Sequence, residues 1–229
     1  MTFDIDLAEL ERVYRAFSLP VAEGHGRSCR VSLMPPRTAL HFYLPPGPGE
    51  QVRRLRVRRS RDQYVISLES KQVIREDPML VEKEETVLAP RLPLERARQM
   101  MSESVPVVSS FIKNQHRVTL KSNSSALKVS LDHMIPFLAD QPTILGPETW
   151  HLEIEEIQGW PISEFLESNF FRQHMSALRP LQKSKWELAR MSSPVALKTA
   201  SACHFRDYLA ILFREGEKQI YPLSAHTAR

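Results

Sequence analysis

Arginines at alternate positions are the feature of this sequence that points most directly to chemistry. In the segment RRLRVRR, Arg54, Arg56 and Arg58 share one parity, whereas Leu55 and Val57 take the other. Because side chains of a β-strand alternate between its two faces, a strand here places these guanidinium groups on one side. Guanidinium groups stay charged and donate paired hydrogen bonds to phosphate oxygens. Two of them two residues apart lie about 7 Å from each other, which suits neighbouring phosphates.

A second segment, WHLEIEEI, presents carboxylates in the same way. Glu153 and Glu155 alternate with Leu152 and Ile154. Two carboxylates on one strand face can supply part of the oxygen shell that Mg²⁺ or Mn²⁺ requires. A basic strand and an acidic strand together predict a site for a phosphate chain and a divalent cation. The alternatives are a solvated basic edge for the arginines and a salt-bridged acidic face for the glutamates.

Period-two patterning recurs along the chain and argues for an antiparallel β protein with helical additions. It occurs at 53–59, 64–73, 81–87, 112–122, 127–134 and 150–157, and helical patterning occurs at 93–104, 161–178 and 202–219. The polar strand faces either lie in water, as in many antiparallel sheets, or line a barrel wide enough for a ligand. The density of like charges favours the second arrangement, because buried charges need a partner, a ligand or a metal.

The composition narrows the class of protein. The chain has 229 residues, of which 42% are hydrophobic and 25% charged, as in ordinary globular proteins. Its formal net charge of +4 suits an anionic ligand. The sequence contains no apolar run long enough to predict a membrane-spanning helix, and its acidic N-terminus does not resemble a signal peptide. We therefore expect a cytoplasmic, intracellular protein. Cys29 and Cys203 match no metal or redox spacing.

Short motifs, in their order along the chain, resemble those of the triphosphate tunnel metalloenzymes, the superfamily of the CYTH proteins and the VTC polyphosphate polymerase domain. They are ELERVY, RLRVRR, YVISLESK, VEKEE, KNQHR, KVSLD, HLEIEE and KSKWELA. The resemblance implies an α+β fold, namely an antiparallel β-barrel tunnel of about eight strands with covering helices and a C-terminal helix. It implies a tunnel domain at 1–190 and a C-terminal helical extension at 191–229 that packs on the same domain.

The resemblance also implies roles for particular residues. The family's phosphate-binding cations correspond to Arg54, Arg56, Lys71, Lys113, Arg117 and Lys185, and Arg58 extends the same row. The metal-binding Glu-Ile-Glu strand corresponds to Glu153 and Glu155, which we expect to be catalytic together with Lys185. Further metal ligands are expected at Glu9 and Glu11, which match the first acids of the family's Glu-x-Glu-x-Lys element, and at Asp132.

The N-terminal element departs from the family pattern. Val13 stands where the family has a lysine, and Arg15 has the parity to replace that charge. The segment DLAELERVYRAF also has the periodicity of an amphipathic helix, in which case Glu9 and Glu11 are not ligands. Asp132 is either a metal ligand or the start of a turn.

The function that the resemblance implies is hydrolysis of inorganic triphosphate, short polyphosphate or another triphosphate compound, by a phosphoric anhydride hydrolase that uses Mg²⁺ or Mn²⁺. One alternative is an ATP-using polyphosphate polymerase or adenylyl cyclase of the same fold, with a nucleotide as partner. The other is a catalytically degenerate module that binds polyphosphate or nucleic acid, which Val13 and the basic net charge favour. No oligomeric state is predicted.

Overall fold

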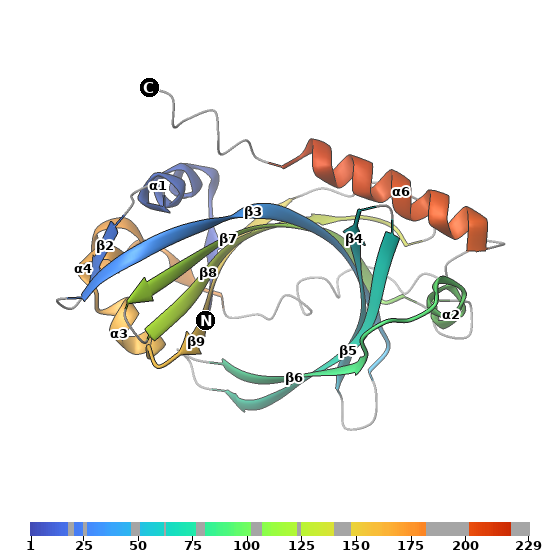
Figure 1. Ribbon diagram of the computed structural model, residues 1–229, viewed down its shortest axis with the longest axis horizontal. Helices are drawn as coiled ribbons and strands as arrows, with labels where there is room; N and C mark the ends of the chain where they lie inside the picture. The colour runs from blue at the N-terminus through green and yellow to red at the C-terminus, as the bar shows by residue number, and fades with distance from the viewer. Residues whose placement is uncertain are drawn as a thin grey trace.

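The chain folds around one antiparallel sheet that bends into a deep arch (Figure 1). The computed structural model describes residues 1–17, 21–24, 27–46, 51–61, 63–76, 81–101, 107–122, 125–139, 148–181 and 202–220. The strands are β1 (Thr2–Ile5), β2 (Val21–Gly24), β3 (Arg27–Leu44), β4 (Val52–Ser60), β5 (Gln63–Glu76), β6 (Val81–Ala89), β7 (Ser109–Ser122), β8 (Ser125–Pro136), β9 (Thr149–Gln158) and β10 (Arg179–Pro180). Their order in the sheet is β10-β1-β9-β8-β7-β3-β4-β5-β6, and β2 pairs with β3.

The helices lie against the outside of the arch (Figure 1). They are α1 (Leu7–Phe17), α2 (Leu94–Met100), α3 (Ile162–Leu166), α4 (Asn169–His174) and α6 (Ala202–Lys218). Polar side chains fix two of the helix starts, because free N–H groups there need acceptors. The Asp6 carboxylate accepts a hydrogen bond from the Glu9 N–H at 2.8 Å. The Ser168 hydroxyl accepts one from the Phe171 N–H at 3.1 Å.

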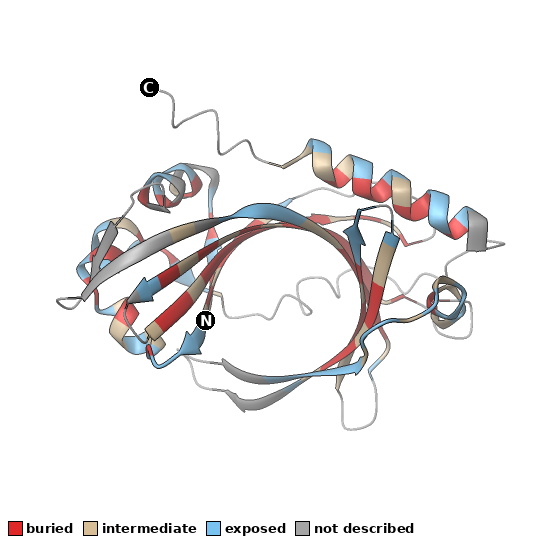
Figure 2. Cartoon of the chain, viewed as in Figure 1, coloured by how far each residue is buried: buried red, intermediate tan, exposed pale blue. Residues whose placement is uncertain are grey.

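Two hydrophobic cores fill the space between the helices and the convex face of the sheet (Figure 2). The first packs α1, α3 and α4 against β7, β8 and β9, and includes Leu10, Val13 and Phe165. The second packs α2 and α6 against β3, β4, β5 and β7, and includes Phe205 and Leu209. Most apolar side chains of the long strands therefore face outward, and the concave face carries the polar side chains together with a smaller cluster of Tyr43, Phe111 and Met134.

The closed barrel of about eight strands that we predicted is not what the structure shows. The sheet has ten strands, and its end strands β10 and β6 are not paired with each other in the described part of the chain. The short strands β1, β2 and β10 are too brief to give a periodic signal. Closure also depends on pairing between segments far apart in the chain, which alternation within a strand does not specify.

The longest strand, β3, was not predicted, because Pro35 and Pro36 interrupt it. Its register against β7 shifts between Met34 and Arg37, so the prolines sit at a β-bulge. Proline has no N–H for a ladder and is tolerated where the ladder is already broken. β3 lies between β7 and β4, and so places the basic residues of β4 and β7 on either side of one strand.

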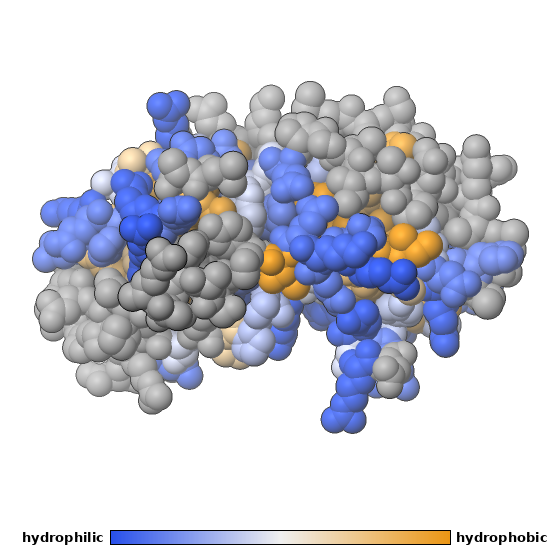
Figure 3. Space-filling view, turned by 90° about the horizontal axis from the view of Figure 1, so that it is seen from above, coloured by the Kyte–Doolittle hydropathy of each residue, from blue (hydrophilic) through white to orange (hydrophobic). Residues whose placement is uncertain are grey.

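The face of the molecule seen from above is mostly hydrophilic where it is described (Figure 3). Seen from above, hydrophilic residues cover most of the described surface and hydrophobic residues form smaller patches (Figure 3). Among the described residues, no helix is both long enough and apolar enough to cross a membrane.

Candidate functional site

The concave face of the arch gathers the charged residues of the central strands. Residues paired across antiparallel strands project to the same side of a sheet. Ala39 of β3 pairs with both Arg58 of β4 and Lys113 of β7, so these cations flank β3 on one face. Asp132 of β8 pairs with Gln115 on one side and with His151 on the other, which continues this face toward the acidic strand β9.

A network of ion pairs makes up the basic side of this face. Arg54 and Arg56 both bind the carboxylate of Glu69, whose side chain is fully buried. The Arg54 Nε donates to Glu69 Oε2 at 2.8 Å, and its Nη2 lies 2.7 Å from Glu85 Oε1. Lys71 Nζ lies 2.8 Å from the other oxygen of Glu85. Burial and the charge of Arg54 lower the pKa of Arg56 to about 10.

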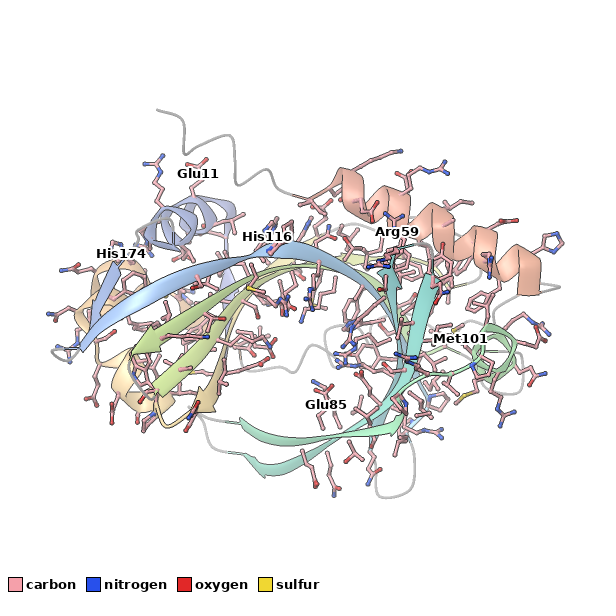
Figure 4. All side chains as sticks on the ribbon, viewed as in Figure 1. Glu11, Arg59, Glu85, Met101, His116 and His174 are labelled. Atoms are coloured by element: carbon pink, nitrogen blue, oxygen red, sulfur yellow. The ribbon has the colours of Figure 1, made fainter. Side chains whose placement is uncertain are left out.

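Neither glutamate of this network was predicted as a site residue from the sequence. Glu69 lies on the predicted polar face of β5, but a buried partner for two arginines could not be inferred from alternation alone. Glu85 lies in VEKEETV, where acidic and basic residues occupy both parities and hide which side faces inward. Figure 4 shows Glu85 projecting from β6 into the space beneath the arch.

Arg37, Arg58 and Arg117 form a second group of cations on the concave face. Burial, together with the charges of Arg37 and Arg58, lowers the pKa of Arg117. The Nε and Nη2 atoms of Arg117 are buried and have no hydrogen-bond partner within the described structure. No ion pair between any of these arginines and a carboxylate is found among the described residues. Buried donors without acceptors are costly, so this group is suited to an anionic ligand.

The acidic side of the face is partly neutralised by lysines. Lys113 Nζ lies 2.7 Å from Asp132 Oδ2 and 3.6 Å from Glu153 Oε2. Asp132 is fully buried, and its other oxygen accepts a hydrogen bond from Gln115 Nε2 at 3.0 Å. Glu155, further along β9, pairs with Lys128. The structure thus brings Lys113, Asp132 and Glu153 together.

The carboxylates on this face supply part of the oxygen ligands that a divalent cation needs. Asp132 and Glu153 both contact one point, the Lys113 ammonium, so two carboxylates converge there. Two carboxylates completed by water and substrate oxygens are the kind of shell that Mg²⁺ accepts. In the described part of the chain, no group of three or more His, Cys, Asp or Glu residues is placed to hold a metal ion. Glu155 has its own lysine partner, and so extends the acidic face instead.

The N-terminal residues expected at the site lie elsewhere, because their segment is a helix. Glu9 is 3.9 Å from Arg12 and Glu11 is 3.6 Å from Arg15, both pairs within α1. Figure 4 shows Glu11 on the outside of the arch, pointing away from the sheet. The structure therefore does not bring Glu9, Glu11 or Arg15 to the concave carboxylates. Val13 is fully buried in the core beneath α1, which explains why an apolar residue stands there.

A buried histidine in β3 completes the concave face. His41 pairs with Arg56 in the register and packs on Phe111, with ring centroids 5.0 Å apart. Its Nδ1 is buried without a hydrogen-bond partner in the described structure. Burial, and then the charges of Arg54 and Lys113, hold the pKa of His41 well below its usual value. In the sequence, His41 and Tyr43 stand at alternate positions, which is the pattern of residues on one face of a strand. His41 was not predicted as a site residue because β3 was not recognised as a strand.

Lys185, the remaining predicted site residue, lies outside the described residues.

Comparison with known proteins gives a likeness in fold. No family model and no curated protein matches the chain. Among solved structures, the fold resembles that of a plant protein from Hippeastrum that is named for adenylyl cyclase and described as having a dominant triphosphatase activity. The TM-score is 0.50 at 13% sequence identity, over 82% of this chain and 92% of that one. At this identity the likeness shows a shared fold.

Proposed function

We propose that this protein is a metal-dependent hydrolase of inorganic triphosphate or short polyphosphate, with its site on the concave face of the arch. The observation behind the proposal is the gathering of cations from β4, β5 and β7 opposite the carboxylates of β8 and β9. Phosphoryl transfer asks a protein mainly for positioning and for neutralisation of charge. The activity described for the structural neighbour supports the same choice.

The basic residues would hold the phosphate chain. Arg117 has buried donors that lack an acceptor among the described residues, and Arg58 lies close enough for its charge to lower the Arg117 pKa. Phosphate oxygens would accept from these groups and remove the repulsion between them. Lys113 lies between this group and the acidic side, so it would contact the end of the chain that reaches Asp132.

The acidic residues would hold the cation. Asp132 and Glu153 are the residues placed to bind Mg²⁺ or Mn²⁺, with Glu155 next to Glu153 on the same face. The bound ion would lower the pKa of a water molecule and neutralise charge on the phosphate chain. Release of Lys113 from Asp132 and Glu153 would then free its ammonium for a phosphate oxygen.

A second function is the use of ATP on the same face, as an adenylyl cyclase or a polyphosphate polymerase. The name of the structural neighbour favours this alternative. The two functions differ in their products, since hydrolysis of triphosphate releases orthophosphate, whereas the alternatives yield cyclic AMP and pyrophosphate, or polyphosphate.

Phosphorus NMR of reactions with Mg²⁺ and with Mn²⁺ tests the proposal, with inorganic tripolyphosphate and ATP as separate substrates. We expect orthophosphate from tripolyphosphate, and we expect Glu153→Gln to slow its release at least about tenfold, because a carboxylate at the metal is lost. Glu156→Gln is the matched control, because Glu156 is exposed on the same strand with the opposite parity. Conversion of ATP alone would favour the second function. Absence of turnover with either substrate, in folded protein that binds tripolyphosphate, would indicate a binding protein.

A further inference from the structure

Glu85 occupies an unusual place for a carboxylate in a cationic site. It lies on β6, the strand at one end of the sheet path, and pairs in the register with Lys71 of β5. Its two oxygens contact two different cations, with Oε1 2.7 Å from Arg54 Nη2 and Oε2 2.8 Å from Lys71 Nζ. Arg56 Nη1 is 3.9 Å from the same Oε1. One carboxylate therefore bridges three of the cations expected to bind phosphate.

The two acids of the basic network differ in exposure. The side chain of Glu69 is 0% exposed and pairs with both Arg54 and Arg56. The side chain of Glu85 is 36% exposed and reaches the same arginines from β6, the end strand of the sheet path. If the Glu85 carboxylate leaves the arginines, water can therefore hydrate it. Release of the Glu69 carboxylate would instead leave a buried charge without a partner. Of these two glutamates, therefore, only Glu85 can be replaced by a ligand at the arginines.

We propose that Glu85 stands in for a phosphate group when the site is empty, and that a ligand must displace it to bind Arg54, Arg56 and Lys71. Glu85 is thus a specificity-determining residue that opposes binding of weakly charged anions. An anion with a single phosphate replaces the Glu85 contacts and gains little else. A chain of several phosphates also reaches Arg117 and Lys113, and this gain offsets the loss. The inference rests on the proposed phosphate site but not on its catalytic activity.

Neutralisation of Glu85 should therefore tighten binding. Calorimetric titration of inorganic tripolyphosphate, without added metal, would compare the wild-type chain with Glu85→Gln and Glu84→Gln. We expect Glu85→Gln to lower the Kd at least about tenfold, a change of about 1.4 kcal/mol. We also expect it to make binding of orthophosphate measurable. Glu84→Gln makes the same change of charge on the same strand, at an exposed residue, and should leave the Kd within about twofold.

The outcomes separate this inference from the proposed function. Tighter binding by Glu85→Gln alone supports the inference, whether or not tripolyphosphate is turned over. Equal tightening by both variants would show a general charge effect and overturn it. Weaker binding by Glu85→Gln would show that Glu85 contributes to ligand binding, and would overturn the inference even if the protein is a triphosphatase. Absence of binding by the wild type and both variants would overturn the inference and the phosphate site together.

Discussion

At the scale of single residues, the site depends on buried charges that satisfy one another. Glu69 lies between Arg54 and Arg56, and Ser67 Oγ donates a further hydrogen bond to Glu69 Oε1 at 2.9 Å. The carboxylate thereby holds two guanidinium groups in place before any ligand binds. Such an arrangement lowers the conformational cost of ligand binding, because the binding groups are already ordered.

Loss of the Glu69 charge should destabilise the fold. Glu69→Gln leaves Arg54, which is buried, without its closest anion, and removal of one partner of a buried ion pair typically costs about 3–5 kcal/mol. We expect a loss of this order in the free energy of unfolding, measured by urea denaturation. Glu95→Gln, which removes the carboxylate of an exposed ion pair with Arg98 in α2, is the control and should cost no more than about 1 kcal/mol. A neutral result for Glu69→Gln would mean that Glu85 alone neutralises the arginines.

A histidine on the convex face should make the fold sensitive to acid. Burial, with a contribution from the charge of His133, lowers the pKa of His116 from 6.5 to about 4. Below pH 6.5 the unfolded chain takes up a proton at this residue and the folded chain does not. The stability from this group is therefore lost as the pH falls from 6.5 toward 4, by about 1.4 kcal/mol per pH unit. Urea midpoints measured across this range should fall less steeply in His116→Gln; equal slopes would contradict the assignment.

At the scale of elements, α6 determines how closely the outer layer approaches the sheet. Gly216 lies near its C-terminal end, and a Cβ built there would be 2.5 Å from Ile112 Cγ2 and 3.2 Å from Thr38 Cγ2. The Gly216 carbonyl also accepts a hydrogen bond from the buried Asn114 Nδ2 at 2.8 Å. The absence of a side chain at this residue therefore lets the helix contact β3 and β7 directly.

The Gly216→Ala substitution has two opposing effects on stability, a gain in helix propensity and a loss from overpacking. Alanine favours a helix over glycine by about 1 kcal/mol, whereas overpacking of a core costs about 1–3 kcal/mol. Because the nearest clash is with the β-branched methyl group of Ile112, we expect packing to dominate and the melting temperature to fall. Arg214→Ala, at an exposed residue of the same helix, should leave it nearly unchanged. A rise in melting temperature for Gly216→Ala would show that α6 shifts freely.

The alternation of polar and apolar residues predicted which segments form the strands of the site. It did not predict where each strand ends or which strands pair with each other. The six period-two segments are all strands, β4 to β9, and the helices predicted at 93–104 and 202–219 are α2 and α6. The helix predicted at 161–178 is divided into α3 and α4, because Ser168 caps a new helix within it. The N-terminal segment is the helical alternative, since Leu10, Val13 and Ala16 all face the core. β3 escaped prediction because its proline pair lies at a bulge.

Part of the site follows from the same strand alternation. Alternation correctly put Arg54, Arg56, Lys113 and Glu153 on polar faces, and the register then brings those faces together. It could not show that Lys113 bridges Asp132 and Glu153, because that contact depends on pairing among three strands. Motif order also placed Glu9 and Glu11 at the site, whereas the hydrophobic face of α1 holds them outside the arch.

At the scale of the whole molecule, the arch separates structural from chemical tasks. Its convex face is covered by helices and holds the two larger hydrophobic clusters, whereas, among the described residues, the concave face holds only the smaller cluster of Tyr43, Phe111 and Met134 (Figure 2). The concave face is thereby free to collect cations and carboxylates. Its basic side includes arginines without carboxylate partners in the described structure, which is where a polyanion gains most.

Binding of a phosphate chain to the concave face is the interaction on which the proposed function depends. Calorimetric titration of tripolyphosphate into the wild-type chain, Arg117→Gln and Arg206→Gln tests it most directly. Arg117 is on the concave face, whereas Arg206 is exposed on the outer helix α6. We predict that Arg117→Gln weakens binding at least about tenfold and reduces its dependence on salt, and that Arg206→Gln changes neither. Equal losses in both variants, or no binding by the wild-type chain, would show that the concave face is not a phosphate-binding site.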